Sequence, residues 1–148
     1  MRKGIIILIS ILVVVLTAFE ESREVEHIFH ELLNKRAAAW NRIFDGDYCF
    51  EDFSKDMESL ARDSLLLEDI EAFKYFRDNS MDMEKVLSIE LCNTKVMKKG
   101  SICHIEGIIL WHLESQEGKE SISDHYCIEM KKHKGNWYLV SLEQKEAM

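Results

Sequence analysis

The side chains best suited to chemistry are one aspartate and two tyrosines. Asp124 stands in an alternating set whose other members are apolar or aromatic: Ile122, Tyr126, Ile128 and Met130. Burial beside Trp111 would raise the pKa of the Asp124 carboxyl group and suit it to proton transfer. Tyr126 or Tyr48 could then donate a hydrogen bond. Near the open end of a strand, Asp124 would instead be hydrated or bonded to a backbone N–H. The pattern leaves both a catalytic and a structural acid open.

The histidines do not form a complete metal site. His104 and His112 are eight residues apart on one expected strand, about 26 Å, which is too far to share an ion. His27 and His30 are three residues apart on an expected helix, close enough to chelate, but no third ligand is identified. The sequence also lacks a phosphate-binding glycine motif and a His-Glu-x-x-His zinc motif. We therefore expect no metal and no cofactor.

Four cysteines would suit disulfide bonds in an exported protein. Cys92 and Cys127 are expected on one sheet face with a strand between them, nearly 10 Å apart, about twice a bridging distance. Cys103 is expected on the opposite face. We therefore expect four free, mostly buried thiols. A bridge from Cys49 to one sheet cysteine is the remaining alternative.

These side chains are positioned by helices in the first half of the chain and by strands in the second. Apolar residues first recur at helical spacing, and after residue 84 the period shortens toward two. The expected helices cover residues 24–44, 50–61 and 66–77. The expected strands cover residues 85–97, 102–114, 121–132 and 137–143. The sequence therefore predicts an α+β domain over residues 24–143, with helices packed on a curved four-stranded antiparallel sheet.

The alternation also predicts a register for the second and third strands. Pairing Ile109 with Tyr126 aligns two apolar faces and leaves a loop of about six residues. A slip by one residue would place His125 opposite Ile109 and mix polar with apolar side chains. The helices would cover the apolar face. A pocket between helices and sheet would be lined by Trp40, Trp111 and Tyr126, and a small-molecule ligand could occupy it.

The other face of the expected sheet is not wholly polar. Ile108 and Leu110 lie on it, together with Cys92 and Cys127. An antiparallel sheet that faces water should not carry so many apolar side chains unless something covers them. We therefore expect an interface at Ile108 and Leu110, in a homodimer or in a larger membrane-protein assembly.

The N-terminal segment is typical of a membrane-inserting helix. Arg2 and Lys3 precede residues 4–19, which carry no charge. This asymmetry predicts insertion with the N-terminus inside and the domain outside. A retained anchor would make residues 1–19 a single-pass helix in the cell membrane, although sixteen apolar residues span only about 24 Å of hydrocarbon. The alternative is a cleaved signal peptide and a secreted protein.

The charge balance argues against nucleic acid as a partner. The chain has a formal net charge of −8, and the part after residue 19 holds 17 basic and 27 acidic residues. An acidic domain is repelled by phosphate backbones. The basic run at residues 131–134 is interpreted as a solvated hairpin turn. We therefore expect no nucleic-acid binding.

The last two expected strands carry a family resemblance. Residues 125–143, HYCIEMKKHKGNWYLVSLE, place a lysine- and glycine-bearing turn before a tryptophan strand. With the long first helix and two short helices, the chain resembles the nuclear transport factor 2-like superfamily, the cone fold shared with ketosteroid isomerase and polyketide cyclases. The resemblance implies a pocket at the mouth of the cone. The isomerase catalytic pattern cannot be matched position by position, so no catalytic role is carried over.

The membrane segment and the small size are similar to those of uncharacterised exported proteins of Gram-positive bacteria. The sequence therefore favours a membrane-tethered extracytoplasmic interaction domain that self-associates and is not an enzyme. The alternative is a small-molecule-binding protein, or an isomerase- or cyclase-like enzyme that uses Asp124.

Overall fold

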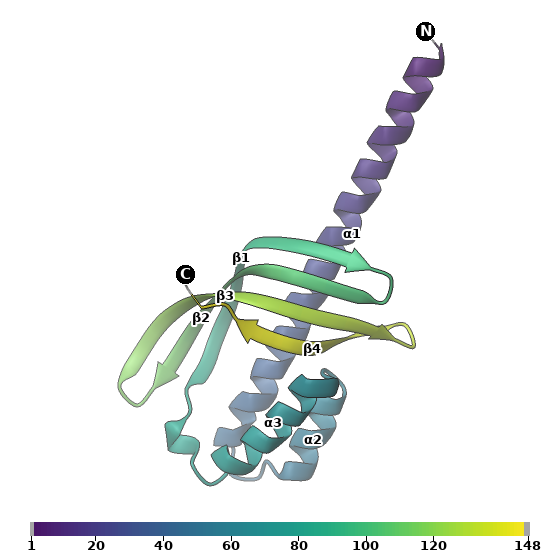
Figure 1. Cartoon of the computed structure of the whole chain (residues 1–148). Helices are drawn as coiled ribbons and strands as arrows, with labels where there is room; N and C mark the ends of the chain where they lie inside the picture. Colours follow the sequence, from purple (N-terminus) through teal and green to yellow (C-terminus); the bar gives the residue numbers. More distant parts are fainter. Residues whose placement is uncertain (1, 147–148) are drawn as a thin grey trace.

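The computed structural model describes residues 2–146, with side chains from residue 11 onward. Helices form the first half of the chain and an antiparallel sheet the second (Figure 1). The helical elements are α1 (Arg2–Asn41), the 3₁₀ turn η1 (Arg42–Phe44), α2 (Phe50–Glu58), α3 (Asp63–Phe76) and the 3₁₀ turn η2 (Ser80–Asp82). The strands are β1 (Lys85–Lys99), β2 (Ile102–Ser115), β3 (Gly118–His133) and β4 (Asn136–Gln144), in the order β1-β2-β3-β4. The predicted α+β class, with helices before a four-stranded antiparallel sheet, is confirmed.

Helix α1 joins the apolar N-terminal segment to the domain as one helix of 40 residues. The predicted start near residue 24 is therefore wrong, because neither glycine nor proline interrupts residues 5–45 and the charged residues after Phe19 are good helix formers. The C-terminal half of α1 buries residues at helical spacing: Val25, Phe29, Leu33 and Ala37. The N-terminal half extends away from the sheet (Figure 1). Among the described residues, no helix combines the length and the apolar character needed to cross a membrane.

The register of β2 and β3 differs from the prediction by two residues. Ile109 pairs with Asp124, and Tyr126 pairs with Gly107. The cause is the turn, because the ladder begins at the pair Ser115 and Gly118, which leaves two residues in the loop instead of about six. Side chains alternate along a strand, so a shift by two keeps every residue on its predicted face.

Strand β1 bends at an irregularity in its pairing with β2. Its pairing is irregular between Cys92 and Lys95, and Asn93 has a φ of 52°. Gly107 of β2 lies against this bend: a Cβ there would stand 3.1 Å from Thr94 Cγ2 and 3.2 Å from the Cys92 carbonyl oxygen. Bulges of this kind increase the local twist of a sheet. The close approach therefore requires glycine and contributes to the curvature of the sheet.

The main core lies between α1 and the inner face of the sheet. Its fully buried members include Phe29, Leu33, Ile105, Ile109, Met130 and Leu139. A second, aromatic cluster joins α2 to α3, where the rings of Phe53 and Phe73 stack with their centroids 4.2 Å apart. The two clusters together fix α1 and α3 against the sheet.

The connection between α2 and α3 is also bonded to the edge of the sheet. The Leu139 N–H donates to the Leu60 carbonyl oxygen (2.9 Å), and the Arg62 N–H donates to the Leu139 carbonyl oxygen (2.8 Å). These bonds cover part of β4, an edge strand that would otherwise offer unpaired backbone groups.

Candidate functional site

A large hollow lies where α1 and α3 meet the β2–β3 turn. Its volume is about 760 Å³, and it adjoins a second hollow of about 370 Å³. The two hollows share four lining residues: Met81, Met83, Ser115 and Gln116. The segment from η2 to the start of β1 thus faces the β2–β3 turn across a continuous depression. We name this depression, formed by the two hollows, the acidic groove.

The floor of the acidic groove contains a buried ion pair between α1 and α3. Arg36 Nε donates to Asp69 Oδ2 (2.8 Å), and Arg36 Nη2 donates to Asp69 Oδ1 (2.5 Å). The indole N–H of Trp40 donates to Asp69 Oδ1 as well (3.1 Å). Asp69 is 2% exposed, and it is buried because Leu65 and Phe73, one turn before and after it on α3, are buried on the same face. The pair neutralises the charge of Asp69 in the groove floor.

The rim of the acidic groove carries five further carboxylates. They line the first hollow and are all exposed: Glu68, Asp82, Glu84, Glu117 and Glu120. The second hollow adds half-buried Glu114 and one cation, Lys85. Within the part of the chain that the structure describes, none of the five makes an ion pair. The hydrogen bond that protonated Glu84 donates to Glu120, together with slight burial and the like charge of Glu120, raises the pKa of Glu84. The rim is therefore a region of unneutralised negative charge.

This charge sits beside apolar surface. Met81 is 75% exposed, Phe44 is 43% exposed, and Trp40 and Phe76 line the depth of the groove. Separated carboxylates attract a cationic partner, and exposed apolar side chains are stabilised when a partner covers them. In the described residues, no three His, Cys, Asp or Glu side chains converge to hold a metal ion. The arrangement suits an extended cationic partner with apolar groups of its own.

The structure separates the three residues predicted to line a pocket. Trp40 does line the acidic groove. Trp111 and Tyr126 instead pack against the main core and contact each other edge to face, with ring centroids 6.2 Å apart. Burial raises the pKa of Tyr126, and the charge of Asp124 acts in the same direction. Because the register is shifted, Trp111 pairs with Ile122 and not with Asp124.

The surroundings of Asp124 lie between the two alternatives that the sequence left open. Asp124 lies on the inner face, as expected, but it is only half-buried and opposite Ile109. It does not line the acidic groove, since the groove begins four pairs closer to the turn, at Leu113 and Glu120. This stretch of β3 is incompletely covered, since Ile122 is 37% exposed.

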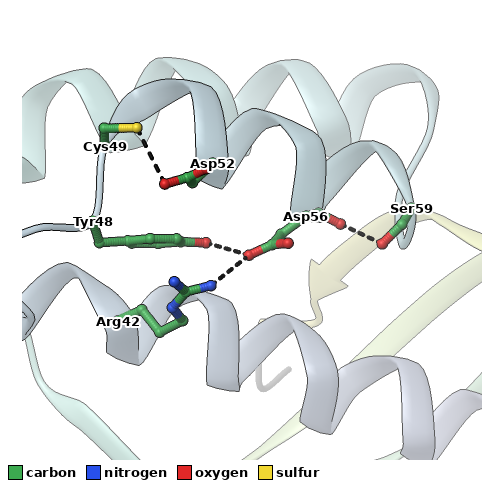
Figure 2. A network of polar contacts seen from close by, with 6 residues as sticks. All are labelled: Arg42, Tyr48, Cys49, Asp52, Asp56 and Ser59. Atoms are coloured by element: carbon green, nitrogen blue, oxygen red, sulfur yellow. Dashed lines mark hydrogen bonds and ion pairs between the residues drawn. The ribbon is translucent and has the colours of Figure 1, made fainter.

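Tyr48 lies apart from the sheet, in the contact between α1, η1 and α2 (Figure 2). Its hydroxyl donates to Asp56 Oδ2 (2.7 Å), and Arg42 Nη1 donates to the same oxygen (3.2 Å). The Arg42 guanidinium also lies 4.0 Å from the centroid of the Tyr48 ring. Burial, followed by the hydrogen bond to Asp56, raises the pKa of Tyr48 well above its usual value. The hydroxyl of Tyr48 therefore joins helices and is not directed toward Asp124.

The two predicted interface residues lie on the outer face of the sheet. Ile108 stands between Cys92 and His125, and Leu110 stands between Glu90 and Ser123. Both side chains are half-buried by these cross-strand neighbours. The apolar strip on this face is therefore narrow and flanked by polar groups.

The four thiols are free, as predicted, but they are not mostly buried. Cys49 and Cys92 are exposed, Cys127 is intermediate, and Cys103 alone is buried. Cys49 donates from Sγ to Asp52 Oδ2 at the start of α2 (3.3 Å) (Figure 2).

Sequence reasoning missed the two residues of the groove floor. The sequence patterns assigned no role to Arg36 or to Asp69. The spacing of residues does indicate a buried carboxylate. Asp69 stands four residues from both Leu65 and Phe73, which places all three on one side of their helix. A carboxylate in such a row needs a cation nearby, and Arg36 lies on the same half of α1 as Trp40.

The comparisons with known proteins show the fold only. No protein-family model matches the chain, and no curated protein matches it. The structure is similar to the solution structure of a SEC-C motif containing protein from Rhodopseudomonas palustris, with 19% identity, a TM-score of 0.50, and coverage of 78% of this chain and 77% of that one. It is also similar to the crystal structure of the intermembrane space region of chloroplast protein ARC6, with 10% identity, a TM-score of 0.50, and coverage of 85% of this chain and 97% of that one. The resemblance to the nuclear transport factor 2-like superfamily stays a prediction.

Proposed function

We propose that this protein is a membrane-tethered interaction domain, held outside the cell membrane by the N-terminal half of α1. The observation that carries the proposal is the continuity of α1. One helix runs from the uncharged segment at residues 4–19 into the buried core at Val25 and Phe29. A domain attached in this way has no flexible linker between anchor and core.

We name residues 4–19 of α1 the stem, and its apolar side chains support a membrane environment. They are 53% to 65% exposed, all around the helix: Ile11, Leu12, Val13, Val14, Val15, Leu16 and Phe19. Covering an exposed side chain of this size stabilises it by about 1.5–3 kcal/mol. The main core includes residues of α1 only from Val25 onward, whereas a lipid bilayer covers every side of a helix. Arg2 and Lys3 would then remain on the inner side, as the charge asymmetry predicts.

The stem would display the acidic groove at a set height. Seventeen residues separate Phe19 from Arg36, which corresponds to roughly 25 Å along a helix. In Figure 1 the groove elements, α3 and the β2–β3 turn, lie at the end of the molecule away from the N-terminus. The groove would thus face partners outside the membrane.

Membrane extraction tests the anchor. We expect the full chain to stay with membranes after alkaline carbonate treatment, and Val13→Lys combined with Val14→Lys to release it. The matched control is Leu67→Lys, since Leu67 is a 66% exposed apolar residue of α3 outside the stem. A wild-type chain that is released at its full mass would contradict the proposal. A mature mass shortened at the N-terminus would favour the secreted alternative.

Thiol labelling tests the side of the membrane. Cys49 and Cys92 are exposed on the domain. A membrane-impermeant maleimide should label them in intact cells if the domain lies outside. Labelling only after lysis would place the domain inside and contradict the proposed orientation. The double variant Cys49→Ser with Cys92→Ser measures how much of the labelling comes from the less exposed thiols of Cys103 and Cys127.

Self-association through Ile108 and Leu110 remains part of the proposal, although their narrow strip offers little apolar area. The enzyme alternative based on Asp124 gains no support from the geometry, because Asp124 lies outside the acidic groove.

A further inference from the structure

We propose that the acidic groove of one copy receives the basic end of a second copy of this chain, so that domains associate head to tail. This inference rests on the proposed function, because it names the partner of the tethered domain. It starts from the two ends of the sheet, which carry opposite charge. The β2–β3 turn is at one end, and the β1–β2 and β3–β4 turns are together at the other (Figure 1).

The basic end is built from two adjacent hairpin turns. The Lys132 N–H donates to the Ser101 carbonyl oxygen (2.7 Å), which joins the β3–β4 turn to the β1–β2 turn. The basic end consists of four exposed lysines: Lys99, Lys131, Lys132 and Lys134. Across the described chain, no carboxylate forms an ion pair with any of them. Like the rim of the groove, this end is left with unneutralised charge.

The basic end also presents apolar surface between its charges. Ile102 pairs with Lys99 on one side and with Lys131 on the other, and it is 38% exposed. Met97, on the same hairpin, is 42% exposed. The acidic groove has the complementary set, with exposed Met81 and Phe44 beside its carboxylates. The basic end and the acidic groove are therefore complementary. Lysines would face carboxylates, and apolar side chains would face apolar side chains.

One copy cannot satisfy its own two ends. They are separated by the length of β2, which is 14 residues, or roughly 45 Å. The basic end must therefore reach the groove of another molecule. Two joined copies would keep one free groove and one free basic end, so the contact is heterologous and open, and it builds rows rather than closed pairs.

The two ends lie at different heights along α1. In Figure 1 the strands cross α1 near the basic end and bend toward α3 at the β2–β3 turn. Lys98 beside the basic end pairs with Glu21, whereas Arg36 lines the groove roughly 22 Å further along the helix. Copies in one membrane therefore make this contact with their stems tilted from the membrane normal. Individual ion pairs between exposed side chains are weak. Tethering compensates for this, because copies confined to one surface meet at a high effective concentration.

The experiment uses the full chain in phosphatidylcholine vesicles, which carry no net charge that could bind the lysines. Copies labelled with ¹⁴N and ¹⁵N are mixed and treated with a zero-length carbodiimide, which joins a lysine directly to a contacting carboxylate. We expect mixed-isotope peptides that link residues 131–134 to Glu117 or Glu120. Their yield should fall at least about tenfold near 0.5 M salt, because screening acts over a few ångströms there.

Two charge-reversal variants make the test specific. The groove variant combines Glu84→Lys, Glu117→Lys and Glu120→Lys, and the basic-end variant combines Lys131→Glu, Lys132→Glu and Lys134→Glu. Each variant alone should lose cross-linking, because both of its ends carry the same sign. Mixing the two variants should restore cross-linking, since each supplies the end that the other lacks. The matched control, Glu20→Lys with Glu24→Lys and Glu51→Lys, changes exposed acids elsewhere and should behave as wild type.

Three outcomes would overturn the inference. They are a membrane-bound wild type without mixed-isotope links, variants that associate as well as wild type, or a mixture that does not recover. Cross-links that persist in the variants but vanish on Ile108→Lys would assign self-association to the outer face instead. A chain that fails to enter the vesicles would contradict the anchor, which separates failure of the proposed function from failure of this contact.

Discussion

Arg36 and Asp69 meet in the floor of the acidic groove through two parallel hydrogen bonds of 2.8 and 2.5 Å, although 33 residues separate them in the chain. The bidentate geometry fixes both position and orientation. It joins α1, which carries the stem, to α3, which forms one side of the groove. The height and the direction of the groove relative to the stem therefore depend on this pair.

The first prediction concerns the Arg36–Asp69 pair. Asp69→Ala should lower the free energy of unfolding by about 2–4 kcal/mol, because it leaves a largely buried guanidinium without its partner. Denaturant unfolding of the full chain in detergent measures this. Lys35→Ala is the matched control, since its pair with Glu31 on the same helix is exposed and should contribute under about 0.5 kcal/mol. Equal effects of the two substitutions would mean that the buried pair has no special role.

The second prediction concerns the hydroxyl of Tyr48. Tyr48→Phe should cost about 1 kcal/mol at neutral pH, because it removes a hydrogen bond to a carboxylate. The raised pKa of Tyr48 also sets a pH dependence. The folded state retains this proton more tightly than the unfolded state, so the contribution is fully present below the usual tyrosine pKa, near 10, and is lost as the pH rises further. Unfolding measured from pH 8 to 11 should be steeper for wild type than for the phenylalanine variant. Parallel curves would contradict this explanation.

The third prediction concerns the carboxylate pair on the groove rim. Glu120→Gln should return the pKa of Glu84 toward its ordinary value, because it removes the neighbouring acid that raises it. Since the folded pKa of Glu84 is raised, its contribution to stability is present at low pH and lost as the pH rises through that value. A carboxyl-detected NMR titration reads the pKa of Glu84 directly. Glu117→Gln is the control on the same rim, and a shift of equal size in that variant would point to general field effects.

The fourth prediction concerns the bend of the sheet at Gly107. Gly107→Ala should destabilise the fold by about 1–3 kcal/mol, because the new methyl group would meet Thr94 and the Cys92 carbonyl oxygen. Thermal unfolding checks this. At Gly46, a Cβ would meet nothing within 4 Å, so Gly46→Ala should be close to neutral. A neutral result at Gly107 would mean that β1 can move away without cost.

The sequence determined the elements and their faces. Helical spacing and strand alternation are local patterns of apolar residues, and they predicted seven elements whose ends agree with the structure to within three residues, apart from the start of α1. The same alternation assigned Ile109 and Asp124 to the inner face and Ile108 and Leu110 to the outer face. These assignments hold because successive side chains along a strand point to opposite faces of the sheet, whichever residues they pair with.

Only the tertiary structure decided the register, the burial of Asp124 and the site. A shift by two residues leaves every face unchanged, so alternation could not distinguish the pairing of Ile109 with Tyr126 from its pairing with Asp124. The groove likewise depends on distances between elements, because Arg36, Asp69 and Glu120 come from three separate segments. Local patterns record which side of an element faces inward, whereas the meeting of distant side chains follows from packing the whole chain.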